Sequence, residues 1–132
     1  MKKFMMMALA AVGALAITGC AQVQVSEGQN LSGQGIATSG TPVAHLTGNN
    51  SGLYFLSFPL ITGSTTEVGS AAFGKDMANV PSVVQMVTEK SNALGAKKTL
   101  DITSQYSSTM IPIPFPFLFY YQSVNVSGNA VK

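Results

Sequence analysis

The side chains that could carry out catalysis or hold a metal ion are few and widely separated in this sequence. There is one histidine, His45, and one cysteine, Cys20. The acidic residues are also scattered: Glu27, Glu67, Asp76, Glu89 and Asp101. A hydrolytic triad needs a nucleophile, a base and an acid that converge, and a metal site needs several His, Cys or carboxylate ligands. Such chemistry would therefore depend on a fold that gathers these distant residues.

His45 is the residue whose surroundings test this most directly. It lies between Ala44 and Leu46 in a stretch rich in strand-forming residues, which favours a solvent-facing or hydrogen-bonded structural histidine. No HxxH or CxxC spacing is present, so we expect no metal site and no bound cofactor. The many serines and threonines have no second base to activate them. We therefore expect a protein without catalytic residues, not an enzyme.

Cys20 stands in a distinctive context at the amino-terminal end. Lys2 and Lys3 precede the apolar run from Phe4 to Ala16, and small residues flank Cys20 in the sequence Ile17-Thr18-Gly19-Cys20. A positive segment, a short apolar segment and a small-residue cleavage site are typical of a secretory signal. The apolar run is too short for a transmembrane helix, which needs about 20 residues. We therefore expect residues 1–19 to be a signal peptide.

This segment resembles bacterial lipoprotein precursors, in which the four residues ending at Cys20 are called the lipobox. The resemblance implies cleavage before Cys20, a thioether-linked diacylglycerol on its sulfur and, in many Gram-negative species, a further acyl chain such as palmitate on the new amine. Two or three acyl chains anchor a protein stably, at about 0.8 kcal/mol per buried methylene. Ala21 resembles the pattern sent on to the outer membrane in Gram-negative species. We expect an envelope protein held by lipid on Cys20, facing the periplasm at the outer membrane if the source is Gram-negative.

The charge of the remaining chain excludes another class of partner. Of the seven basic residues, all of them lysines, two belong to the signal peptide, and the other five balance the five acidic residues. Arginine, which provides bidentate recognition of phosphate, is absent. Nucleic-acid binding needs a cationic surface. We therefore expect no nucleic-acid partner.

Composition divides the rest of the chain into two parts. Residues 20–40 are polar and glycine-rich, which is typical of a flexible tether with a reach of roughly 25 Å. A first strand at Val23 to Ser26 is the alternative. Residues 41–132 contain enough apolar residues for one α+β domain. We expect a hairpin in it, with strands at Pro42 to Thr47 and Leu53 to Phe58 joined by a turn at Gly48 to Gly52.

The clearest element is a helix between Asn79 and Leu94. Asn79 suits an N-cap, Pro81 suits the first turn, and Gly95 suits a left-handed residue after the end. Half-buried strands should follow at 98–106 and about 118–127, with a loop at 62–74. The expected order is β-β-α-β-β: a small antiparallel or mixed sheet with one amphipathic helix on one face.

The segment from Met110 to Phe117 carries alternating prolines and apolar residues. Prolines fix φ and lack donors, so we expect an extended loop that does not pair in the sheet. It could fold back as a lid on the core, or form an exposed patch for a membrane or a protein of the envelope.

The helix end at Leu94-Gly95-Ala96, followed by a strand, resembles small, poorly characterised envelope lipoproteins such as the tRNA-locus-like group. This resemblance implies no catalytic residue. We expect a non-catalytic lipoprotein that acts by protein contacts. The alternative is a binder of a small ligand, glycan or peptide, with Tyr54, Tyr120 or Tyr121 as stacking surfaces.

Overall fold

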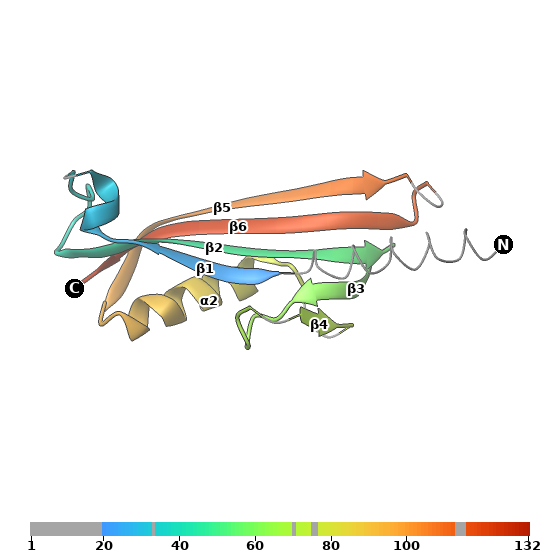
Figure 1. Ribbon diagram of the computed structural model, residues 1–132, viewed down its shortest axis with the longest axis horizontal. Helices are drawn as coiled ribbons and strands as arrows, with labels where there is room; N and C mark the ends of the chain where they lie inside the picture. The colour runs from blue at the N-terminus through green and yellow to red at the C-terminus, as the bar shows by residue number, and fades with distance from the viewer. Residues whose placement is uncertain (1–19, 33, 70, 75–76, 113–115) are drawn as a thin grey trace.

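The computed structural model describes residues 20–132 except 33, 70, 75–76 and 113–115. The expected signal peptide therefore lies outside the described residues, as does Asp76. The described chain forms a mostly antiparallel six-stranded sheet with a single α-helix against one face (Figure 1). Its elements are β1 (Ala21–Ser26), the 3-10 helix η1 (Gly28–Leu31), β2 (Pro42–Phe55), β3 (Phe58–Gly63), β4 (Ala71–Phe73), α2 (Val80–Ala93), β5 (Lys98–Ile111) and β6 (Phe119–Val131).

Strand β2 is the centre of the sheet, whose order is β4-β3-β2-β6-β5. One edge of β2 pairs with β6. The opposite edge pairs first with β1, from His45 to Asn50, and then with β3, from Gly52 to Phe55. The strands β1 and β3 therefore follow one another along a single edge of β2 (Figure 1). Strand β5 forms the opposite edge of the sheet. No helix in the described part of the chain is long and apolar enough to cross a membrane.

The α+β class is as expected, but the order β-β-α-β-β is wrong. Four strands precede the helix, and two follow it. The main error is the turn placed at Gly48 to Gly52, because β2 continues through these residues without a break. Gly48 serves close packing here. A Cβ at this position would overlap Cγ2 of Val87 and lie 3.1 Å from Cγ1 of Val83, both on α2.

The helix α2 confirms the prediction between Asn79 and Leu94. The Asn79 side chain accepts a hydrogen bond from the backbone N–H of Ser82 at 2.9 Å, which satisfies one donor of the first turn. Gly95 has φ of +81°, as a residue after the helix end requires. The buried side of the helix carries Val83, Met86, Val87 and Ser91. The apolar members of this set, Val83, Met86 and Val87, pack on β2 and β6 and form the core with residues of both strands.

The two faces of the sheet differ sharply. On the helical face, Leu46, Val124 and Val126 are buried under α2. On the other face, which we call the open face, the alternate residues of β2 and β6 point away from the helix. They include Asn49 and Asn125, which are opposite each other. Among the described residues no second layer covers the middle of this face.

Strand β5 also differs from expectation. Instead of a half-buried strand at 98–106, it runs to Ile111, and every residue from 101 to 110 is exposed. Over residues 101–110, therefore, both faces of β5 are open to solvent. Met110 and Ile111 pair with Tyr120 and Phe119. The expectation that the segment from Met110 does not pair is therefore wrong for these two residues, while 113–115 lie outside the described residues.

Residues 21–26 form strand β1 and are not part of a flexible tether, which was the first expectation for them. The alternative of a strand at Val23 to Ser26 is the one observed, with Ala21 as its first residue. Ala21 is completely buried on the helical face. The polar residues Gln22 and Gln24 occupy the open face, which explains why this strand looks like linker sequence.

Candidate functional site

Cys20 lies at the point where the two short strands meet on the edge of β2. Its carbonyl accepts a hydrogen bond from the backbone N–H of Ser51 at 3.1 Å, so it continues the pairing of β1 with β2. Gly69 donates to the carbonyl of Ala21 at 2.9 Å and fixes the next residue as well. Cys20 is exposed and has no disulfide partner. Because Ala21 faces the helix, strand alternation puts the Cys20 side chain on the open face.

The open face carries a polar array built from side chains of three adjacent strands. The Asn49 amide nitrogen donates to Oδ1 of Asn125 at 2.7 Å and to Oγ of Ser123 at 3.2 Å. The hydroxyls of Thr103 and Ser127 are 2.7 Å apart. A shallow groove of about 240 Å³ runs over this array, lined by Thr47, Gln105 and Asn125 among others. These hydrogen bonds order an uncharged surface and offer no nucleophile next to a base.

His45 also lies on the open face. Of the two roles expected for it, solvent-facing or hydrogen-bonded, the structure shows a hydrogen-bonded histidine. Its Nδ1 lies 2.8 Å from Oδ1 of Asn129, and the Asn129 amide nitrogen donates to Oδ2 of Asp101 at 3.1 Å. Asp101 sits at an irregularity in β5 with φ of +54°. The amide of Asn129 therefore separates the histidine from the carboxylate. No group of three or more His, Cys, Asp or Glu residues that could hold a metal ion occurs within the described ranges.

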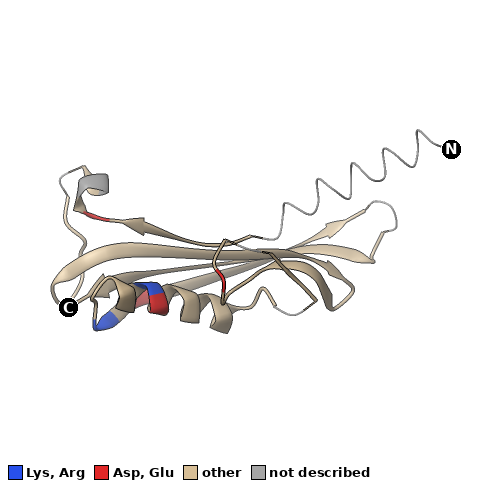
Figure 2. Cartoon of the chain, turned by 60° about the horizontal axis from the view of Figure 1, so that its bottom comes forward, with Lys and Arg blue, Asp and Glu red and all other residues tan. Residues whose placement is uncertain are grey.

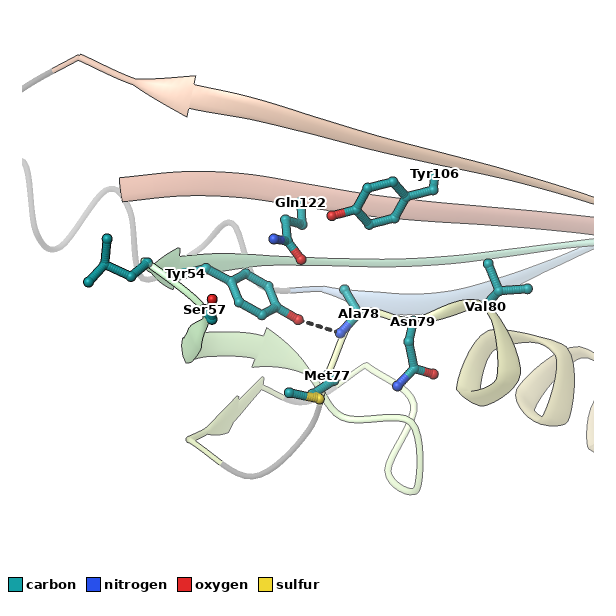
Figure 3. Close-up of a pocket in the computed structure, with 9 residues that line it drawn as sticks. Tyr54, Ser57, Met77, Ala78, Asn79, Val80, Tyr106 and Gln122 are labelled. Atoms are coloured by element: carbon teal, nitrogen blue, oxygen red, sulfur yellow. Dashed lines mark hydrogen bonds between the residues drawn. The ribbon is translucent and has the colours of Figure 1, made fainter. Parts of the chain in front are cut away.

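A cavity of about 360 Å³ lies on the helical face, at the amino-terminal end of α2 (Figure 3). Tyr54, Tyr106 and Gln122 line it from three strands, and Met77 and Ala78 line it from the segment before the helix. Of the tyrosines expected as stacking surfaces, only Tyr54 lines this cavity. Tyr120 is opposite Tyr54 on the helical face, whereas Tyr121 is on the open face. The three therefore do not form one binding surface.

Tyr54 ties the segment before the helix to the sheet. Its hydroxyl oxygen accepts a hydrogen bond from the backbone N–H of Ala78 at 2.7 Å (Figure 3). The Tyr54 side chain is 3% exposed. Burial raises the pKa of this hydroxyl above its ordinary value; the bond from Ala78 works against the rise, and the nearby Tyr106 adds to it. This phenol is a structural hydrogen-bond partner in its neutral form.

Tyr54→Phe should lower the free energy of unfolding by about 1–3 kcal/mol, because the N–H of Ala78 is left buried without its acceptor. Denaturant unfolding measures this loss, and Tyr106→Phe, at an exposed position, is the matched control. Above about pH 10 the unfolded chain releases the Tyr54 proton more readily than the folded one. Stability should therefore fall as pH rises past this value, less so in Tyr54→Phe. Equal stability of both variants at neutral pH would contradict the structural role.

The polar array was missed from the sequence, whereas Tyr106 was among the tyrosines that could line a groove. One signal was present, because Ser123, Asn125, Ser127 and Asn129 alternate with small or apolar residues near the end of the chain. This pattern indicates a strand with one polar, uncharged face. No protein-family model matches the chain, and no similar curated protein and no similar solved structure was found.

Proposed function

We propose that this chain is a lipid-anchored protein of the bacterial cell envelope that has no catalytic role and binds another protein along strand β5. The lipobox ending at Cys20 supports the anchor, and the exposed position of Cys20 at a strand end is compatible with modification. If the source is Gram-negative, Ala21 favours the outer membrane and a domain facing the periplasm. The partner was expected at Met110 to Phe117, and the proposed surface includes the first two residues of that segment.

The observation that carries the protein contact is the free edge of β5. This strand pairs only with β6 among the described elements, and its ten exposed residues from 101 to 110 present a long backbone edge. From Ile102 to Ile111 it contains no charged residue and no proline. Natural proteins commonly protect such edges with charge, proline or a covering segment, because an unpaired edge accepts another strand. Strand addition to β5 is the recognition mode that fits this edge.

The pairing pattern identifies which backbone donors of β5 point outward. Ser51 donates to Cys20, so the odd-numbered N–H groups of β2 face β1 and the even-numbered ones face β6. The even-numbered residues of β2 are opposite even-numbered residues of β6, such as Asn50 and Val124, and these exchange the hydrogen bonds between the two strands. The odd-numbered residues of β6 therefore hydrogen-bond with β5. Ser107 is opposite Ser123 and therefore bonds to β6, whereas the N–H of Ser108 points away from the sheet. A partner strand would use donors such as that of Ser108.

The test places a photoreactive amino acid at Gln105, an exposed β5 residue, in cells that produce the lipidated protein. We expect one defined envelope protein to be crosslinked. Ser108→Pro should reduce this crosslink at least tenfold, because proline removes an outward donor while a proline at a sheet edge keeps the β6 ladder. Ser108→Ala should leave it unchanged. Ser107→Pro is expected to weaken the fold itself, which denaturant unfolding would show.

An unchanged crosslink in Ser108→Pro would contradict strand addition. Recovery of no protein from any β5 position would contradict the protein contact as a whole. It would then favour the second candidate function, a small ligand, glycan or peptide bound in the cavity beside Tyr54 and Tyr106. That candidate rests on the volume of the cavity and on its two aromatic side chains.

A further inference from the structure

One end of the sheet exposes a group of large apolar side chains. We call this group the apolar end, and it comprises Phe55, Leu56, Phe58, Leu60, Phe73 and Phe117. Phe58, Phe73 and Phe117 are 72%, 66% and 67% exposed, more than any other large apolar residue in the described part of the chain. The group lies at the end of β2, in β3 and β4, and just before β6 (Figure 1).

The rings on this surface extend over neighbouring strands. Phe55 contacts Phe119 edge to face, with ring centroids 5.4 Å apart. Phe58 is opposite Phe55, and Phe73 is opposite Ile61 in the next pair of strands. Tyr121 is opposite Leu53 and adds an amphipathic ring on the open face of the sheet. Large contiguous apolar surfaces on a folded domain mark sites of contact with proteins or membranes.

Charge is absent from the apolar end as far as the structure describes it. The described charged residues lie elsewhere, on the helix, at the opposite end of the sheet and in the loop between β3 and β4 (Figure 2). They are Glu27, Glu67, Glu89, Lys90, Lys97, Lys98, Asp101 and Lys132. Within the described residues, the apolar end therefore carries aromatic and aliphatic side chains without an ionised group among them.

The expected lipid attachment point lies close to the apolar end and on the same face. Cys20 is opposite Ser51, and Phe55 is four residues further along β2. At 3.3–3.4 Å per residue, this separation is about 13 Å along the strand. Ser51 and Phe55 both face the open side, as does Cys20 by strand alternation. Since β1 begins at Ala21, no flexible segment separates the lipid from this surface.

We infer that the apolar end lies in the interfacial zone of the bilayer, next to the lipid on Cys20, as a second membrane contact. This inference rests on the proposed lipid anchor. Interfacial segments insert apolar side chains about 5–10 Å into the boundary between headgroups and acyl chains, a depth that a tilted sheet reaches from an anchor about 13 Å away. Aromatic side chains are favoured in this zone. The anchored edge of the sheet then rests on the membrane, and the β5 edge stays accessible.

Single tryptophans provide the test, because the natural chain contains none. Lipidated Phe58→Trp or Phe73→Trp protein is reconstituted into vesicles of phosphatidylethanolamine and phosphatidylglycerol, with or without brominated acyl chains. Gln105→Trp, on exposed β5, is the matched control. In vesicles, we expect the indoles of Phe58→Trp and Phe73→Trp to emit at shorter wavelength than the control indole. They should also be quenched several-fold more by brominated lipid, and several-fold less by aqueous acrylamide.

Lipid labelling of Cys20 in the same preparations distinguishes failure of the second membrane contact from failure of the lipid anchor. If Cys20 carries lipid but both test indoles remain as accessible to acrylamide as the control indole, the second membrane contact is overturned and the anchor stands. If both are shielded from acrylamide but insensitive to brominated lipid, a protein covers the apolar end, and the inference is again overturned. If Cys20 carries no lipid, the proposed anchor itself fails, and the inference fails with it.

Discussion

Cys20→Ser should abolish incorporation of radiolabelled palmitate and leave a precursor that is larger by the signal peptide. The thioether requires a sulfur atom, and Cys20 is the only cysteine of the chain. Without two or three acyl chains, the mature part has only weak contacts to hold it to a membrane. Labelling, electrophoretic mobility and membrane fractionation measure the three effects together. This is the largest change that we expect from a single substitution.

Gln22→Ser is the matched control, since it changes an exposed side chain of β1 and keeps Cys20 and Ala21. It should label and fractionate as the natural protein does. Normal palmitate labelling of Cys20→Ser would contradict the proposed anchor. Ala21→Asp, the usual change to test sorting, is unsuitable here. Ala21 is completely buried beside Asn50, so a carboxylate at this position would weaken the fold.

Gly48→Ala should lower the free energy of unfolding by about 1–3 kcal/mol, because the added methyl group overlaps Val87 and crowds Val83 on α2. The sign is the informative part, since alanine in place of glycine normally favours an ordered chain through lower entropy of the unfolded state. Denaturant unfolding at equilibrium measures the loss. Gly35→Ala, at an exposed position with open space around it, should be neutral or slightly stabilising.

Val87→Ala should partly rescue Gly48→Ala, because it removes the methyl groups that the new Cβ meets. A double-mutant cycle with Gly48→Ala, Val87→Ala and the double variant measures this coupling, which we expect at about 0.5–3 kcal/mol. Additive effects, or a stabilising Gly48→Ala, would contradict the close approach of α2 to β2. They would also weaken the explanation of why β2 passes through a glycine-rich sequence.

The helix was predictable because every signal for it is local. Asn79 caps it, the valines share one face, and Gly95 takes the left-handed conformation that follows the last turn. The order of the strands was not predictable from local signals. The residues Gly48 to Gly52 are typical of a turn, but here they pair with β6 on one side and with β1 or β3 on the other, and Gly48 leaves room for α2. Contacts between segments that are far apart in the sequence decide this case.

The first strand was obscured by its polar face. Gln22, Gln24 and Ser26 are solvent-facing partners of β2 residues on a face that no second layer covers, so half of β1 has linker-like composition. The β5 residues on the open face are exposed for the same reason, because no described layer covers that face. For the candidate site, Cys20 is a prediction that rests on its sequence context alone. Its pairing with Ser51 required the register of β1 with β2, which follows from contacts across the sheet.

The hydrogen bond from Ser51 to Cys20 also has a mechanical consequence. A mechanical force applied at Cys20 acts directly on the sheet, because no flexible residue lies between Cys20 and β1. The hydrogen bond between Ser51 and Cys20 is the first to bear this force. Since Cys20 is at the very end of β1, a pull directed away from the sheet edge opens the β1 ladder one bond at a time. A pull along the strand instead shears all of its bonds together. The resistance of the domain to detachment therefore depends on the direction of the load, and residues 28–41 provide the extra length once β1 has peeled away.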